Sequence, residues 1–115
     1  NSEIAEVMVR QVAAKAPARY VQYLRQFSRS EDLKTREACL GALMQLAQVR
    51  HADLFLERLP FEEGELKDGL RGCLSQFLKS EADVITKEVV KATTSDIPQV
   101  RATAMALFTK LPNRS

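Results

Sequence analysis

Three six-residue stretches decide the fold of this chain. Residues 38–43 have the sequence ACLGAL, residues 72–77 GCLSQF and residues 103–108 TAMALF. They align without gaps, so that Cys39, Cys73 and Ala104 take the same place, and a weaker match adds Ala5 before them. These positions recur at intervals of roughly 30–35 residues, which is a typical period for a repeated unit of two helices. Such a unit cannot bury its apolar faces without its neighbours.

Outside these stretches, apolar residues recur every three to four positions, which is typical of helices rather than strands. Pro17 suits a first helical position, Ser30 and Ser80 are expected caps, and Pro60 and Pro112 are expected to end helices. We expect seven helices, over about residues 4–15, 17–28, 32–49, 52–59, 64–79, 81–93 and 95–111. Breaks this short make neighbouring helices antiparallel. The predicted fold is all-α: antiparallel helical hairpins stacked as a short right-handed α-solenoid, with a closed helical bundle as the alternative.

The composition fits one globular domain over residues 1–115. Hydrophobic residues make up 45% and charged residues 28%, and the net charge of +2 is too small to imply nucleic acid or membrane by itself. No apolar run approaches the ~20 residues that span a bilayer. Two cysteines suggest no disulfide framework, which favours a reducing, cytoplasmic location. Because the chain begins at Asn1 without an initiator Met, we expect it to be part of a larger protein.

Two segments resemble a known repeat family. Residues 98–107 (PQVRATAMAL) and 32–43 (DLKTREACLGAL) are similar to the second helix of a HEAT repeat, of the armadillo-type α-solenoid class. The resemblance covers repeats at about 17–49, 51–79 and 81–111, preceded by a half-repeat at 4–15. The middle repeat departs from the pattern, with Leu66 and Leu70 in the aspartate and arginine places, and Asp96 lies one residue off the register of Asp32.

Arg36 and Arg101 fall within the apolar arcs of their helices, so we expect their guanidinium groups to be buried and paired. The resemblance implies that each bonds a turn aspartate of a neighbouring repeat and sets the stacking, with Asp32 and Asp96 as partners. The alternative is a role in ligand binding. The aligned stretches also predict that Phe77 and Phe108 are core residues.

The second predicted helix has one apolar face and one polar, basic face. Arg19, Arg25 and Arg29 project together with Gln22 and Gln26, and no acid lies between Val7 and Ser30. A solvated polar face is the plainer interpretation. The functional interpretation is a basic strip for an acidic protein segment or a phosphate backbone.

Catalytic and metal-binding patterns are not evident. A single His51, no CxxC pair and no glycine-rich phosphate loop argue against an enzyme, a zinc site or a cofactor. Cys39 and Cys73 are expected to pack, and His51 to help start the fourth helix. The acidic cluster Glu62, Glu63, Glu65 and Asp68 is interpreted as helix capping.

The sequence therefore favours a non-enzymatic protein–protein interaction scaffold with a polypeptide partner. Its partner-binding residues are expected to be Arg19, Gln22, Arg25, Gln26, Arg29, Lys34, Glu37, Gln45, Gln48, Lys67 and Arg71. One alternative is a nucleic-acid-binding domain that uses the basic stretch Arg10 to Arg29. Another is an accessory domain of a larger enzyme.

Overall fold

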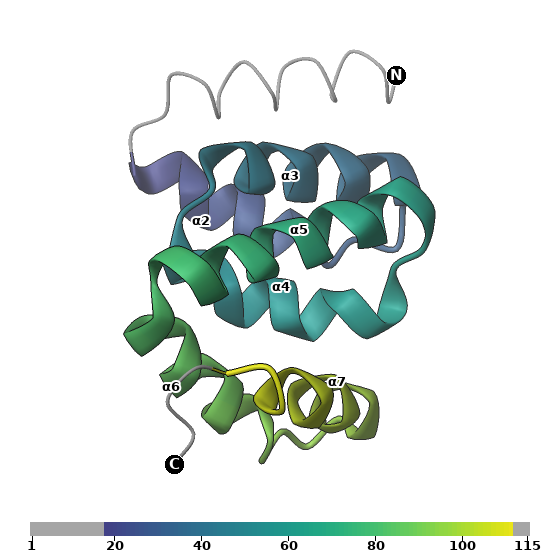
Figure 1. Ribbon diagram of the computed structural model, residues 1–115. Helices are drawn as coiled ribbons and strands as arrows, with labels where there is room; N and C mark the ends of the chain where they lie inside the picture. The colour runs from purple at the N-terminus through teal and green to yellow at the C-terminus, as the bar shows by residue number, and fades with distance from the viewer. Residues whose placement is uncertain (1–17, 112–115) are drawn as a thin grey trace. The chain divides into compact units, whose positions relative to one another are not determined.

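The computed structural model describes residues 18–111, and over that range the chain is helical without a β-strand (Figure 1). The described elements are α2 (Ala18–Phe27), α3 (Leu33–Leu46), the 3-10 turn η1 (Val49–His51), α4 (Ala52–Arg58), the 3-10 turn η2 (Leu59–Phe61), α5 (Gly64–Ser80), α6 (Ala82–Ala92) and α7 (Pro98–Phe108). The all-α prediction is confirmed for these residues. The helix expected at 4–15 lies outside them. The chain divides into two compact units, Asn1–Gln48 and Val49–Ser115.

In the N-terminal unit, α2 packs against α3. Val21 and Leu24 are the buried apolar residues of α2, and α3 buries a run that includes Cys39 and Leu43. The cap of α3 is Asp32, whose carboxylate accepts hydrogen bonds from the Thr35 amide at 2.9 Å and the Thr35 hydroxyl at 2.7 Å. Ser30, the cap expected from the sequence, instead accepts from the Asp32 amide at 3.1 Å. The carboxylate takes the cap because it lies directly before the first helical residue.

Helix α3 ends at Leu46, short of the predicted end at Val49. Ala47 adopts the left-handed conformation (φ 51°, ψ 44°), and its amide bonds to the carbonyls of Leu43 and Met44. A left-handed residue at this place satisfies carbonyls that the helix itself leaves open. The residue is an alanine rather than a glycine, so the sequence does not signal the stop.

The C-terminal unit is organised around the short helix α4. Helix α4 contacts α5, α6 and α7, and Figure 1 shows it lying between α5 and the α6–α7 pair. Buried residues of α4 include Ala52, Leu54, Phe55 and Leu56, as expected for a helix with neighbours on several sides. The Phe55 and Phe77 rings stack nearly parallel with centroids 6.2 Å apart, which joins α4 to α5.

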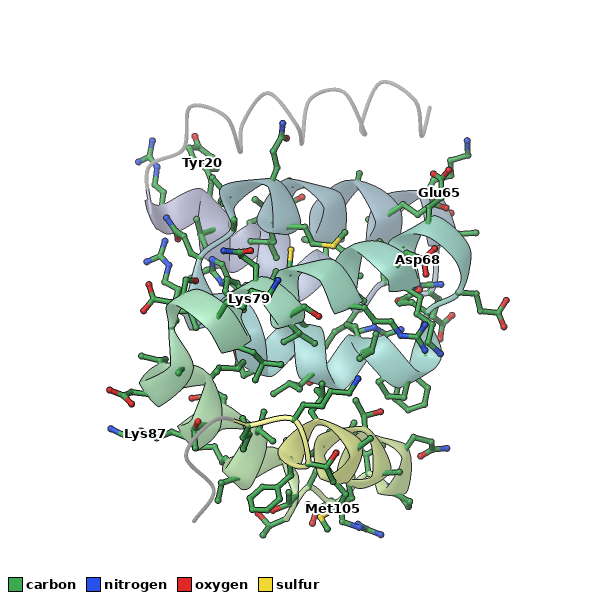
Figure 2. All side chains as sticks on the ribbon, viewed as in Figure 1. Tyr20, Glu65, Asp68, Lys79, Lys87 and Met105 are labelled. Carbon is green, nitrogen blue, oxygen red and sulfur yellow. The ribbon has the colours of Figure 1, made fainter. Side chains whose placement is uncertain are left out.

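The prediction for the two aligned phenylalanines is half right. Phe77 is 2% exposed, which confirms it as a core residue, whereas Phe108 is 37% exposed. The expectation for Phe108 is wrong because it lies at the last position of α7, where the described residues cover it only in part. Met105 on the same helix is 56% exposed and projects outward in Figure 2.

The hairpins α2–α3 and α6–α7 share one turn geometry. The amides of 28, 29 and 30 bond to the carbonyls of 24, 26 and 27, and those of 93, 94 and 95 bond to 89, 91 and 92. The hydroxyl of Ser30 accepts from the Asp32 amide, and that of Ser95 accepts from the Ile97 amide. Residues 93–95 follow residues 28–30 by the same number of positions as Ala104 follows Cys39. Cys39 and Ala104 are both fully buried.

The two turns differ at the cap. Ile97 occupies the place of Asp32 and makes no side-chain cap bond, so Asp96 is indeed one residue out of register. Ser80 is the last residue of α5 rather than a cap, and its hydroxyl bonds back to the Gln76 carbonyl. Helix α7 ends at Phe108, and two tighter turns carry the chain to Leu111.

Candidate functional site

The basic strip predicted on the second helix lies on α2 and its following turn. Arg19, Gln22, Gln26 and Arg29 are exposed and Arg25 is half-buried, opposite the buried Val21 and Leu24. The Arg19 guanidinium lies 5.1 Å from the centroid of the Tyr20 ring, and Arg29 donates to the Arg25 carbonyl at 3.3 Å. Four of the five residues are therefore exposed, Arg25 is half-buried, and their role in binding stays a prediction.

The other predicted partner-binding residues divide between the two units. Lys34, Glu37, Gln45 and Gln48 are exposed in the N-terminal unit. Lys67 and Arg71 belong to the C-terminal unit. A single surface that combines them remains a prediction.

The two arginines expected between repeats each bond the backbone of the turn before their own helix. Arg101 is exposed, and its Nη1 donates to the Ser95 carbonyl at 2.7 Å. It makes no ion pair within residues 18–111, so the predicted burial and the Asp96 partner are both wrong. Arg36 is half-buried, and its Nη1 donates to the carbonyls of Ser30 at 3.0 Å and Glu31 at 3.3 Å. Each arginine therefore closes the turn that precedes its own helix.

A pocket of about 270 Å³ lies in the C-terminal unit, which we call the α5–α7 pocket. Its walls are one face of α5 and one face of α7 with the turn after it, and η2 lies beside them. The described lining residues are Leu59, Pro60, Lys67, Arg71, Leu74, Ser75, Thr103, Ala106, Leu107 and Lys110. Lys67, Arg71 and Ser75 are spaced four residues apart on α5, which places them on one side of that helix.

The charge of the α5–α7 pocket is positive. Lys67, Arg71 and Lys110 contribute three cations, and the described lining includes no carboxylate. None of the three makes an ion pair within residues 18–111. Three cations without a neutralising acid raise the local concentration of anions.

The hydroxyl groups of the pocket are also distinctive. Every other serine and threonine in residues 18–111 makes a side-chain hydrogen bond within the chain, as Ser80 does to Gln76, Thr86 to Ala82 and Thr109 to Ala106. Ser75 and Thr103 make none there. Helical hydroxyls commonly bond the preceding turn, so these two retain donors for a ligand.

Apolar side chains form the rest of the α5–α7 pocket. Leu59 and Leu74 are buried, and Leu107 is half-buried beside Ala106. A second hollow of about 180 Å³ in the same unit is acidic, because Asp53, Glu57 and Glu88 line it with Lys91 as its one described cation. The two hollows therefore have opposite electrostatic character.

An ion pair beside η2 was missed at the sequence level. Glu62 is 2% exposed, and its Oε2 accepts from Arg58 Nη2 at 2.8 Å and Nε at 3.1 Å. Glu62 is a buried partner of Arg58, a contact that its interpretation as a capping acid did not include. The sequence feature that could have predicted this pair is the four-residue spacing of an arginine and a glutamate. Pro60 lies between them, however, and argues against one continuous helix.

The two thiols and the imidazole of residues 18–111 are buried or half-buried. Burial raises the pKa of the Cys39 thiol to about 11 and also raises the pKa of Cys73, which disfavours the thiolate that nucleophiles and metal ligands require. His51 is buried at the start of α4, where its ring centroid lies 6.4 Å from the ring centroid of Phe55. Within residues 18–111, no cluster of three or more His, Cys, Asp or Glu side chains is arranged to hold a metal ion.

No family model matches this sequence, and no curated protein or solved structure is significantly similar to it. None of the helices in the described part of the chain has the length and apolar character needed to cross a membrane.

Proposed function

We propose that this chain is a non-enzymatic, HEAT-like helical-repeat scaffold that binds a polypeptide partner in the cytoplasm. The observation that carries the proposal is the α5–α7 pocket, which combines cations and hydroxyl donors with an apolar surface. Cations and hydroxyl donors line a partly apolar hollow, and its described lining contains no histidine, cysteine or carboxylate. Catalysis by acid–base or nucleophilic steps commonly uses such groups, whereas recognition does not need them.

The repeat architecture is supported by the shared turns of α2–α3 and α6–α7. Two segments with the same hydrogen bonds at a fixed displacement are expected of a duplicated helical hairpin. Stacked hairpins present extended surfaces, and this is the form we propose for the chain rather than a closed bundle. In the N-terminal unit, the exposed polar residues of α3, among them Lys34, Glu37 and Gln45, are proposed as further partner-binding residues.

Site-specific photocrosslinking tests the proposal. A benzophenone-bearing amino acid is placed at Ser75 in the pocket, at Gln22 on the α2 strip and at Lys87 as a control, and the protein is irradiated in a cell extract. We expect polypeptide adducts from Ser75 in clear excess over Lys87. Equal labelling at all three positions, or adducts that nuclease removes at Ser75, would contradict the proposal.

Nucleic-acid binding is the second candidate because of the α2 strip. Arg19 and Arg29 are exposed on one face of α2 and its turn, and no acid interrupts the stretch in sequence. Phosphate backbones are bound by such strips with steep salt dependence. Nuclease-sensitive adducts at Gln22 without polypeptide adducts at Ser75 would favour this function.

A further inference from the structure

We infer that the α5–α7 pocket recognises an acidic polypeptide segment in which an aliphatic side chain lies beside carboxylates. This inference rests on the proposed scaffold function and names the chemistry of its partner. It follows from the charge, the hydrogen-bonding capacity and the apolar surface of one pocket.

The charge argument comes from Lys67, Arg71 and Lys110. They reach the pocket from two different elements, α5 and the turn after α7, and have no ion-pair partner within residues 18–111. An arginine donates to a carboxylate through two parallel N–H groups, and lysines add point charges. A partner that supplies carboxylates provides the counter-charges that the described pocket lacks.

The hydrogen-bond argument comes from Ser75 and Thr103. Ser75 lines the pocket from α5 and Thr103 lines it from α7. Among the serines and threonines of residues 18–111, these two make no side-chain hydrogen bond within that range. Carboxylate oxygens accept several hydrogen bonds, so two neutral donors beside three cations suit such a group. Neutral donors also fix the orientation of the group, which point charges alone do not.

The apolar surface argues for a polypeptide rather than a nucleic acid. Leu59, Leu74, Ala106 and Leu107 line the same hollow as the cations. A phosphodiester backbone offers charge but no aliphatic group for this surface. An acidic segment with a leucine or isoleucine next to its carboxylates fills both parts of a volume of about 270 Å³.

The test measures binding of a short fluorescein-labelled peptide of glutamates interrupted by two adjacent leucines. Fluorescence anisotropy is recorded with the whole chain at low salt. The same peptide with glutamine for glutamate, the same peptide with glycine for leucine, and a single-stranded oligonucleotide of the same number of units are the comparison probes. We expect the glutamate–leucine peptide to bind most tightly and both peptide replacements to weaken binding.

Paired variants separate the pocket from general charge. Lys67→Gln with Arg71→Gln removes two pocket cations, and Lys79→Gln with Lys87→Gln removes two exposed cations elsewhere in the same unit (Figure 2). Both pairs change the net charge equally. We expect the first pair to weaken binding at least about tenfold and the second to change it less than about twofold. Ser75→Ala with Thr103→Val, which leaves the charge unchanged, should weaken binding several-fold, whereas Thr86→Val should not.

Other results would overturn the inference. The inference is wrong if the two pairs of cation variants weaken binding equally, or if the glutamate–leucine peptide does not bind. It is also wrong if the oligonucleotide binds more tightly than that peptide. Thermal melts of each variant distinguish lost binding from misfolding, which is not expected because none of the four changed pocket residues is fully buried. The scaffold proposal and this inference can fail separately. If polypeptide adducts at Ser75 persist in the Lys67→Gln, Arg71→Gln protein, the scaffold proposal stands and the acidic-segment inference is excluded.

Discussion

Phe77 and Phe108 occupy matching places on two helices but have different surroundings. Phe77 is 2% exposed and stacks on Phe55, whereas Phe108 is 37% exposed. We expect Phe77→Ala to lower the free energy of unfolding by about 3–5 kcal/mol, because a buried aromatic leaves a cavity. Phe108→Ala should cost less than about 1 kcal/mol. Urea unfolding of both variants checks this, and a loss below about 1 kcal/mol for Phe77 would mean that its ring is not in the core.

The Arg58–Glu62 pair makes a second prediction at this scale. Glu62 is 2% exposed and Arg58 16%, so removing the guanidinium takes a close partner from a buried carboxylate. Arg58→Met should cost about 3 kcal/mol, the lower end of the range for buried pairs, because Arg58 keeps some contact with water. The double variant Arg58→Met, Glu62→Leu should recover most of that loss. Unfolding by guanidinium chloride measures the free energy of unfolding of both variants. A double variant no more stable than Arg58→Met would contradict a buried ion pair as the cause of the loss.

Residue patterns predict the site only in part. The spacing on one helix identifies Lys67 and Arg71, and Ser75 shares that face. Such a pattern does not predict Lys110 and Thr103 as pocket residues. They line the pocket because α7 lies near α5 in the folded chain, which no local sequence pattern encodes. The burial of Glu62 is not predicted for a related reason, since burial of a charged residue depends on a partner that folding supplies.

At the scale of elements, Asp32 links the cap of α3 to pH. The Thr35 hydroxyl, then the Thr35 amide, hold the pKa of the Asp32 carboxyl below its ordinary value. A carboxyl whose folded pKa is lowered stabilises the protein above its unfolded pKa, and this contribution is lost as the pH falls through the folded pKa. Asp32→Ala should therefore lower the melting temperature at pH 7 and differ little from the parent at a pH below both pKa values. Asp96→Ala, which removes no cap, is the control, and an equal deficit of Asp32→Ala at both pH values would exclude the linkage.

The turn arginines give the second prediction at the scale of elements. Arg101 is exposed and closes its turn through one carbonyl, whereas the half-buried Arg36 bonds two. Arg101→Met should cost less than about 1 kcal/mol, since exposed hydrogen bonds contribute little. Arg36→Met should cost more than Arg101→Met. Matched urea melts compare them, and a larger loss at Arg101 would restore the role between repeats that the sequence suggests.

Periodicity predicts the type of each element well and its ends poorly. Helix α5, expected over 64–79, spans Gly64–Ser80, because its apolar spacing is regular and Pro60 and Gly64 separate it from α4. Helix α3 stops at Leu46 because Ala47 turns left-handed, and alanine gives no signal for that conformation. Both Ser30 and Asp32 are good caps, and only the position of the first helical turn selects between them.

At the scale of the whole molecule, the solenoid and the closed bundle predict different opening behaviour. Repeat arrays lose structure unit by unit, whereas a small closed bundle unfolds as one cooperative body. The chain divides into two compact units, and each has its own buried side chains, such as Leu24 in the first and Phe77 in the second. Under the proposed solenoid, each core controls the stability of its own helices most strongly.

Hydrogen exchange read by mass spectrometry distinguishes these cases. Leu24→Ala should lower amide protection chiefly in α2 and α3, and Phe77→Ala chiefly in α4 to α7, because a cavity weakens first the helices that share its core. Phe108→Ala serves as a variant that should leave protection in both units nearly unchanged. If Leu24→Ala instead lowers protection by the same factor throughout α2 to α7, the chain opens as a single body. That result would favour the closed bundle and remove the repeat architecture on which the proposed scaffold is built.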